Sequence, residues 1–326
     1  MDTVKLGVAG VGHFGRFHAL KAAASPQAQL IGVYDRDPER ARTVGWEAGA
    51  PPMPFADLIA ASDAIIIAAP AEAHYELAAQ AIRAGRHVLI EKPIASTLDE
   101  ADSLAALAAE HDVVLQVGHL ERFSAAHGAV STRMGQPLYI EAVRVAPFKP
   151  RGTDVSVILD LMIHDLDLIL ALVDAPIESV DAVGAAVASA HEDIANARVR
   201  FTNGCVATIT ASRISLKTER RMRIFAQSGY IAVDFAGRKL TAISKDLGGF
   251  PVPGMPEFSI KEMAWEDHDS LAAEHEAFYA SVLDGAPVLV DAAAGRRALA
   301  AAIAVKVAMD RSNAIVTAAG LLNAAR

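Results

Sequence analysis

Lys92, His164 and the acidic residues around His164 are the groups in this sequence that could move a proton. Lys92 follows an apolar run that ends at Ile90, and Asp160, His164 and Asp167 are spaced four and three residues apart. On a regular helix this spacing places all three on one face. An imidazole with an ordinary pKa of about 6.5 can accept the proton of an alcohol. A lysine can stabilise the alkoxide that forms. The residues therefore predict acid–base chemistry on a hydroxyl group. Whether Lys92 or His164 takes the proton stays open, as does a relay through both.

A glycine pattern near the N-terminus is typical of a dinucleotide-binding turn. Gly10, Gly12 and Gly15 follow an apolar run and open a helical segment. The first glycine permits a tight turn, the second lets a pyrophosphate approach the backbone, and the third allows close packing of helix on sheet. Asp35 lies 35 − 15 = 20 residues after the last glycine, where a carboxylate accepts hydrogen bonds from ribose hydroxyls. This carboxylate favours NAD over NADP, while the neighbouring Arg36 leaves use of both cofactors open.

Apolar runs that alternate with helical segments must position these groups. The runs cover residues 4–9, 30–34, 64–69, 87–90 and 113–117, and helical segments lie between them. Strands that are apolar on both faces and alternate with helices form a parallel sheet covered on both sides. We therefore expect an α/β fold in which residues 1–118 form an N-terminal Rossmann domain with a doubly wound parallel sheet. Lys92 would emerge at the carboxyl edge of this sheet, where such folds bind ligands.

The pattern changes after residue 118. Long alternating segments at 137–147, 195–201 and 206–209 are followed by helical segments at 271–283 and 292–309. This order predicts a C-terminal α+β domain, residues 119–326, with an open, mostly antiparallel sheet. Thr202, Asn203 and Gly204 predict a type I′ hairpin between two of the strands. A strongly apolar segment at 155–172 predicts a buried helix that carries Asp160 and His164.

Several motifs together resemble the glucose-fructose oxidoreductase / inositol 2-dehydrogenase (Gfo/Idh/MocA) family. They are Gly10-x-Gly12-x-x-Gly15-x-x-His18, Pro70-x-x-x-His74, Glu91-Lys92-Pro93, Gly118-x-x-x-Arg122-Phe123 and Asp160-x-x-x-His164-x-x-Asp167. The resemblance covers nearly the whole chain. It implies a Rossmann domain followed by an open-sheet domain, a substrate held over the nicotinamide, and a cis peptide bond between Lys92 and Pro93.

The expected site residues follow from these motifs. We expect the cofactor, NAD or also NADP, to be bound by Gly10, Gly12, His13, Phe14, Gly15, Asp35, Arg36, Ala69, Pro70, His74, Glu91 and Lys92. The expected catalytic residues are Lys92, His164 and Asp160. The expected substrate-binding residues are Arg122, Arg151, His119, Asp160 and His164. No histidine pair has a third ligand at metal-site spacing, so no metal site is predicted.

Two segments narrow the expected substrate. Leu120 and Met162 replace an Asn and a Gly that many family members carry. The stretches 117–123 and 153–168 are similar to those of the branch that oxidises C3 of UDP-N-acetylglucosamine, before an aminotransferase makes a diamino sugar for lipid A. Arg122, Arg144, Lys149, Arg151 and Arg213 lie on segments that could border the cleft, although each taken alone is more typical of a surface charge. Arg side chains can hold the diphosphate of such a substrate. A free sugar, a cyclitol or another nucleotide sugar stays an alternative, as does a non-catalytic NAD-binding regulator.

Composition limits the remaining function classes. The 326 residues include a single Cys and carry a formal net charge of −9. One Cys excludes a disulfide scaffold. The acidic balance without a basic block disfavours nucleic acid and anionic membrane surfaces as partners. No apolar run is long enough to span a bilayer. We expect a cytoplasmic homodimer or homotetramer that associates through the open sheet.

Overall fold

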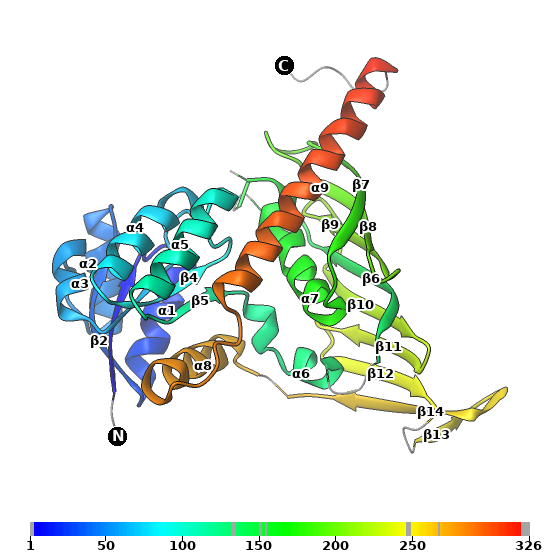
Figure 1. Ribbon diagram of the computed structural model, residues 1–326, viewed down its shortest axis with the longest axis horizontal. Helices are drawn as coiled ribbons and strands as arrows, with labels where there is room; N and C mark the ends of the chain where they lie inside the picture. Colours follow the sequence, from blue (N-terminus) through cyan, green and yellow to red (C-terminus); the bar gives the residue numbers. More distant parts are fainter. Residues whose placement is uncertain are drawn as a thin grey trace. The chain divides into compact units, whose positions relative to one another are not determined.

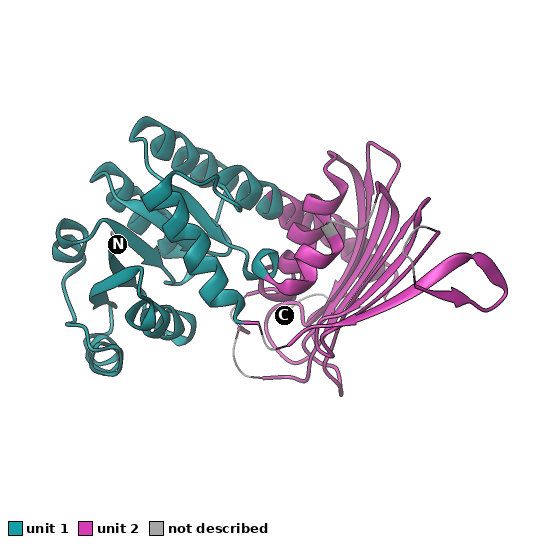
Figure 2. Ribbon diagram, turned by 90° about the horizontal axis from the view of Figure 1, so that it is seen from below, with its two compact units in different colours: residues 1–123, 269–299 teal, residues 124–268, 300–326 magenta. Residues whose placement is uncertain are grey.

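A computed structural model describes residues 3–131, 135–149, 152–153, 155–245, 249–266 and 268–320. Contacts divide the chain into two units, one of residues 1–123 with 269–299 and one of residues 124–268 with 300–326 (Figure 2). The grouping of residues 269–299 with the N-terminal part has no counterpart among the domains predicted from the sequence. The predicted domain boundary at residue 118 stays a prediction.

The described part of the first unit contains a five-stranded parallel sheet in the order β2-β1-β3-β4-β5. Its strands are β1 (Val4–Ala9), β2 (Ala28–Tyr34), β3 (Ala64–Ile67), β4 (His87–Glu91) and β5 (Leu115–Gly118). Its helices are α1 (His13–Ala24), α2 (Pro38–Ala48), α3 (Phe55–Ala61), α4 (Ala71–Arg83), α5 (Leu98–Glu110), the 3-10 turn η1 (Leu120–Phe123) and α8 (Ser270–Asp284). Helices cover the strands on both sides (Figures 1 and 2). The predicted doubly wound α/β fold is confirmed.

Local signals in the sequence set the helix ends of the first unit. Asp37 caps α2 by accepting hydrogen bonds from the backbone N–H groups of residues 39 and 40, and Pro38 follows as the first helical residue. Thr97 and Glu100 form a reciprocal capping box at the start of α5. These caps fix where each helix leaves the sheet, and therefore which backbone groups lie at its carboxyl edge.

Helix α8 completes the core of the first unit. Phe278 and Tyr279 are fully buried and belong to the same apolar cluster as Leu6, Val8 and Leu89 of strands β1 and β4. The buried area of two aromatic side chains is a large share of what holds a small core together. A segment more than 150 residues downstream thus packs against the first strand of the chain.

The second unit is built on a nine-stranded sheet within the described residues. Its order is β13-β14-β12-β11-β10-β6-β9-β8-β7, and only the β6–β9 pair among these neighbours is parallel. The strands are β6 (Pro137–Val145), β7 (Ile177–Ala185), β8 (Ile194–Phe201), β9 (Val206–Ser212), β10 (Glu219–Ala226), β11 (Gly229–Asp234), β12 (Lys239–Ser244), β13 (Phe250–Val252) and β14 (Met255–Ala264). The predicted mostly antiparallel sheet is confirmed.

Helices of the second unit lie on one face of its sheet. They include α6 (Ala125–Ser131), the π-helical turn η2 (Ile158–Met162), α7 (Ile163–Val173) and the later part of α9 (Ala292–Ala318). Figure 1 shows α7 and α9 on the same side of the strands, and α7 contacts β6 and β9. Helix α7 is as buried as its apolar sequence predicts.

The hairpin between β8 and β9 is not the predicted type I′ turn. A type I′ turn needs positive φ at both central residues, but of the residues in this loop only Gly204 has it, at +89°. The backbone N–H of Gly204 donates to the carbonyl of Phe201, and the N–H of Cys205 donates to Asn203 Oδ1. Asn203 therefore uses its side chain to close the turn, and glycine alone takes the left-handed conformation.

Of the helices in the described ranges, none combines the length and the apolar character needed to cross a bilayer.

Candidate active site

The turn after β1 can be formed only with glycine at two of its three glycine positions. Gly10 has φ +83°, and a Cβ there would lie 2.4 Å from the backbone nitrogen of Ala69. A Cβ on Gly15 would lie 1.8 Å from the carbonyl oxygen of Gly10. Both distances are far inside van der Waals contact, so the tight turn and the close helix packing require these glycines.

Gly12 faces open space. A Cβ built on Gly12 meets no described atom within 4 Å, and none of the described side chains caps the start of α1. The first-turn N–H groups of a helix attract anions, both as donors and through the helix dipole. A helix start that lies behind an open glycine fits the pyrophosphate of a dinucleotide.

Asp35 is held against the glycine loop at the end of β2. Its side chain is 5% exposed, and its carboxylate accepts hydrogen bonds from the backbone N–H of Val11 and of Asp37, both at 2.9 Å. Arg40 Nη1 donates to Asp35 Oδ1 at 3.3 Å. The sequence indicated Arg36 as the neighbouring cation, but Arg36 is exposed. Arg40, near the start of α2, was not predicted, and its side chain contacts Asp35.

His74 joins the ends of two neighbouring strands. Its Nδ1 lies 2.7 Å from the carbonyl oxygen of Pro93, after β4, and its Nε2 lies 2.8 Å from that of Ala69, after β3. Burial lowers the pKa of His74, against the opposing effect of these two hydrogen bonds. The Lys92–Pro93 peptide bond is cis, as expected. His74 thus ties the backbone just after Lys92 to the end of the neighbouring strand β3.

A buried chain of polar groups lies behind Lys92. Glu91 Oε1 is 3.0 Å from His18 Nε2, and His18 Nδ1 is 2.8 Å from His275 Nε2. His275 Nδ1 is in turn 3.0 Å from the hydroxyl of Tyr279. The sequence singled out His18 and Glu91 but not the two residues of α8, because nothing in the local pattern links positions 257 residues apart.

Asp160 lies in a π-helical turn, where the prediction of a regular helix over 155–172 is wrong. The backbone N–H of Ile163 donates to the carbonyl of Ile158, five residues back. This turn is wider than a regular α-helical turn, and the shared face expected for Asp160 and His164 stays a prediction. His164 and Asp167 follow in α7, where the regular spacing holds.

Two arginines that the sequence offered as cleft residues are instead buried in ion pairs. Arg144 of β6 binds Asp165 of α7 through Nε at 2.8 Å and Nη2 at 3.0 Å. Arg213 binds Asp193 through Nε at 2.8 Å and also donates to the carbonyl of Gly152. Both carboxylates are at most 5% exposed, so these pairs belong to the interior. The two guanidinium groups therefore stabilise the interior of the second unit.

The remaining expected substrate residues divide between described and masked positions. His119 is buried and its backbone N–H donates to the carbonyl of Val117, just after β5. Arg122 is half-buried in η1. Arg151 lies outside the described residues.

Comparison with known proteins assigns both parts of the chain. Residues 4–119 match the family model described as an oxidoreductase family with an NAD-binding Rossmann fold. Residues 127–232 match the GFO/IDH/MocA C-terminal domain. The chain belongs to the GFO/IDH/MocA oxidoreductase family. Its first unit is accordingly an NAD-binding Rossmann domain, and the glycine loop and Asp35 described above fit that cofactor.

Relatives within the GFO/IDH/MocA family differ in their printed substrates. The chain is 44% identical over 315 residues, 95% of its length and 98% of the relative, to the UDP-N-acetylglucosamine 3-dehydrogenase of Acidithiobacillus ferrooxidans. A solved structure of that enzyme has a TM-score of 0.89 at 43% identity and covers 95% of this chain and 99% of its own. The scyllo-inositol 2-dehydrogenase (NAD(+)) of Bacillus subtilis is 26% identical, covering 88% of this chain and 89% of the relative.

A more distant structure agrees in fold. The scyllo-inositol dehydrogenase of Lactobacillus casei, with bound NAD(H) and scyllo-inositol, has a TM-score of 0.80 at 21% identity, covering 95% of this chain and 98% of its own.

Proposed function

We propose that this protein oxidises the C3 hydroxyl of UDP-N-acetylglucosamine to a ketone with NAD as oxidant. The observation that carries the proposal is the 44% identity, over nearly the full length of both chains, to a UDP-N-acetylglucosamine 3-dehydrogenase. The inositol dehydrogenases are much less similar. The fit of the glycine loop and Asp35 to a dinucleotide supports the cofactor.

The chain's own residues supply binding and proton transfer. NAD, when bound, accepts the hydride from the sugar carbon. Gly12 and the start of α1 would hold the pyrophosphate, and Asp35 the adenosine ribose. Lys92 follows β4 at the carboxyl edge of the sheet, where it can donate a hydrogen bond to the hydroxyl oxygen that becomes an alkoxide.

His164 and Asp160 are the proposed residues of the second unit. His164 would take the hydroxyl proton, directly or from Lys92, and Asp160 would orient it or bind a neighbouring sugar hydroxyl. His119, Arg122 and Arg151 are the proposed contacts to the rest of the nucleotide sugar. Guanidinium groups suit a diphosphate because they donate two parallel hydrogen bonds.

The test is a substrate panel. The purified protein is mixed with NAD and UDP-N-acetylglucosamine, other UDP-sugars, glucose or myo-inositol, and reduced cofactor is followed by absorbance. A ketone trap or an aminotransferase is included, since it removes the keto product. Turnover of UDP-N-acetylglucosamine alone is expected. Turnover of glucose or inositol instead would reject the substrate, and tight NAD binding without any turnover would favour a non-catalytic regulator.

Substitutions test the two proton-handling residues. Lys92→Met and His164→Ala should each lower kcat by about 100-fold or more, since removing a positioned acid or base costs about that much. Lys239→Met, an exposed lysine on β12, is the matched control and should leave kcat unchanged. Full turnover in either site variant rules that residue out as an acid or base.

The proposal extends to the surroundings of the enzyme. A 3-keto sugar is a substrate for an aminotransferase, which we propose as the next enzyme, in the cytoplasm and toward lipid A. We also propose a homodimer or homotetramer. The rings of Tyr139, Phe225 and Tyr230 make tilted contacts across β6, β10 and β11, and these residues alternate with the buried Ile140 and Ile224. Such an aromatic face supports self-association, which light scattering measures.

A further inference from the structure

The hydrogen bonds from Glu91 to Tyr279 run in one direction. A carboxylate only accepts, so His18 Nε2 donates to Glu91. With His18 neutral, its Nδ1 accepts from His275 Nε2 and His275 Nδ1 accepts from the hydroxyl of Tyr279. Burial supports this arrangement, since it holds the pKa of His275 well below and that of Tyr279 well above their ordinary values. Every polar atom between the two ends then has a partner.

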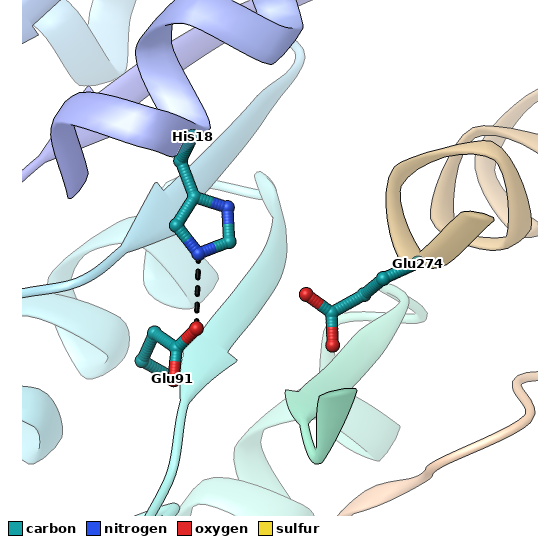
Figure 3. A group of neighbouring side chains, drawn as sticks. All are labelled: His18, Glu91 and Glu274. Atoms are coloured by element: carbon teal, nitrogen blue, oxygen red, sulfur yellow. Dashed lines mark hydrogen bonds and ion pairs between the residues drawn. The ribbon is translucent and has the colours of Figure 1, made fainter. Parts of the chain in front are cut away.

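Glu274 lies beside this row of hydrogen-bonded side chains but forms none of its hydrogen bonds. Its side chain is fully buried, and neither carboxyl oxygen has a hydrogen-bond partner among the described residues. Ligand atoms of Glu274, Glu91 and His18 all lie within 4.8 Å of one another. Figure 3 shows the carboxyl group of Glu274 directed toward that of Glu91. The backbone of Glu274 is fixed by Gln116, whose Nε2 donates to its carbonyl.

Two buried carboxyl groups this close do not both ionise, because each charge opposes the other and neither is solvated. Glu91 receives two hydrogen bonds, from His18 Nε2 and from the backbone N–H of Lys92, whereas Glu274 receives none from the described groups. The negative charge is therefore stabilised on Glu91 and the proton on Glu274.

The pKa directions of the two groups agree with this placement. Burial and the Glu91 charge raise the pKa of Glu274 well above its ordinary value. Burial also acts to raise the pKa of Glu91, but the hydrogen bond from His18 and the charge of Lys92 bring it below its ordinary value. Two further charged groups affect the pKa of His275: Asp269 raises it and Lys21 lowers it.

We propose that Glu274 is a positioning residue that stays a neutral carboxylic acid near pH 7 and so keeps Glu91 as the ionised acceptor of the Lys92 backbone N–H. This proposal rests on the proposed role of Lys92 for its catalytic consequence, but the state of Glu274 does not depend on any substrate. A divalent cation held by His18, Glu91 and Glu274 is the competing occupant, and it would require both carboxyls to be ionised.

Infrared difference spectroscopy tests the state of Glu274 directly. The wild-type protein at pH 7 should show the C=O stretch of a protonated carboxylic acid, shifted in D₂O, which Glu274→Gln removes. Glu91→Gln should keep the band, because burial, the largest cause of the raised pKa of Glu274, is unchanged in that variant. Persistence of the band in Glu274→Gln, or its absence in the wild type, overturns the proposal.

Metal analysis tests whether a divalent cation binds His18, Glu91 and Glu274 instead. The protein is incubated with Zn²⁺, Mn²⁺ or Co²⁺, desalted, and its metal content measured. No stoichiometric ion is expected. One equivalent that is bound by the wild type and lost in Glu274→Gln would show two ionised ligands and overturn the neutral acid.

A pH profile tests the positioning role. Glu274→Gln keeps a neutral group beside Glu91 at every pH, so the acidic limb of kcat/KM should not move. In the wild type, ionisation of Glu274 at high pH adds a second charge beside Glu91 and should give an alkaline limb that Glu274→Gln lacks. The same alkaline limb in both proteins would mean that Glu274 only fills space. If no substrate is turned over, the infrared result still stands, so failure of the proposed function and failure of this inference remain distinguishable.

Discussion

Asp35 Oδ2 lies 2.9 Å from the backbone nitrogen of Val11, so the carboxylate that ends β2 is tied to the middle of the glycine loop. The loop therefore presents its helix N-terminus for a pyrophosphate while the same contact fixes a negative charge nearby. With the proposed roles, one pair of residues would give both affinity for a dinucleotide and discrimination against an extra phosphate.

Removing the charge of Asp35 should reduce the preference for NAD over NADP. Asparagine keeps an oxygen that can accept the Val11 N–H but no longer repels a 2′-phosphate. For Asp35→Asn we expect the ratio of the NADP to the NAD dissociation constant to fall about tenfold, equivalent to about 1.4 kcal/mol. Titration of both cofactors by calorimetry measures this ratio. Asp37→Asn is the control, because Asp37 is a nearby carboxylate that caps α2. An unchanged ratio in Asp35→Asn would contradict the role proposed for Asp35.

Gly12 and Gly15 should respond differently to alanine. In Gly15→Ala the new Cβ meets the Gly10 carbonyl, so both NAD affinity and stability should fall, the stability by about 1–3 kcal/mol. In Gly12→Ala the Cβ enters open space, so the melting temperature should be kept while NAD affinity is lost. Thermal melts with and without NAD separate the two outcomes. Tight NAD binding by Gly12→Ala would contradict the proposal that the pyrophosphate lies against Gly12.

His275 and Glu274 should make opposite contributions to stability as the pH falls. His275 stays neutral in the folded protein but protonates in the unfolded chain below about pH 6.5. Below that pH, His275 therefore lowers the free energy of unfolding by up to about 1.4 kcal/mol for each further pH unit. Glu274 keeps its proton in the folded protein, so its contribution is present below its ordinary pKa of 4.5 and is lost as pH rises through the raised value.

Denaturation between pH 5 and pH 8 measures these contributions as differences from the wild type. On acidification His275→Gln should lose less stability than the wild type, and Glu274→Gln should lose more. Exposed His191→Gln is the control and should follow the wild type. Parallel curves for all four proteins would contradict the buried states assigned to both residues.

The ion pair of Arg144 with Asp165 should be costly to break from one side. Asp165→Asn removes the carboxylate charge that binds this buried guanidinium through two of its nitrogens, and we expect a loss of about 3–5 kcal/mol in unfolding free energy. The double variant Arg144→Met with Asp165→Leu should recover much of this loss. Arg296 and Asp102 pair through the same two guanidinium nitrogens on the surface, and Asp102→Asn is expected to change stability little. An equally small effect at Asp165 would contradict the buried pair.

The sequence predicts what depends on local pattern and misses what depends on distant partners. Short apolar runs such as 64–69, which contains β3, predicted the parallel sheet, because burial on both faces leaves few other arrangements. Arg144 and Arg213 looked like surface cations because their carboxylate partners lie 21 and 20 residues away on other elements. The π-helical turn at Asp160 has no distinguishing residue, so the regular spacing was extended through it.

The candidate site divides along the same line. The glycines, Asp35 and Glu91-Lys92-Pro93 were found because each motif is contiguous or has a fixed spacing. His275 and Glu274 were missed because α8 has no such motif, and only the folded chain brings it beside His18.

The return of residues 269–299 to the first unit has a consequence for the order of synthesis. A ribosome that has released only residues 1–123 has delivered all five strands of the Rossmann sheet but neither Phe278 nor Tyr279 of its core. The nascent nucleotide-binding domain must wait, with an apolar face uncovered, until some 150 further residues have emerged. The second unit is therefore made almost entirely within the time that the first is still incomplete.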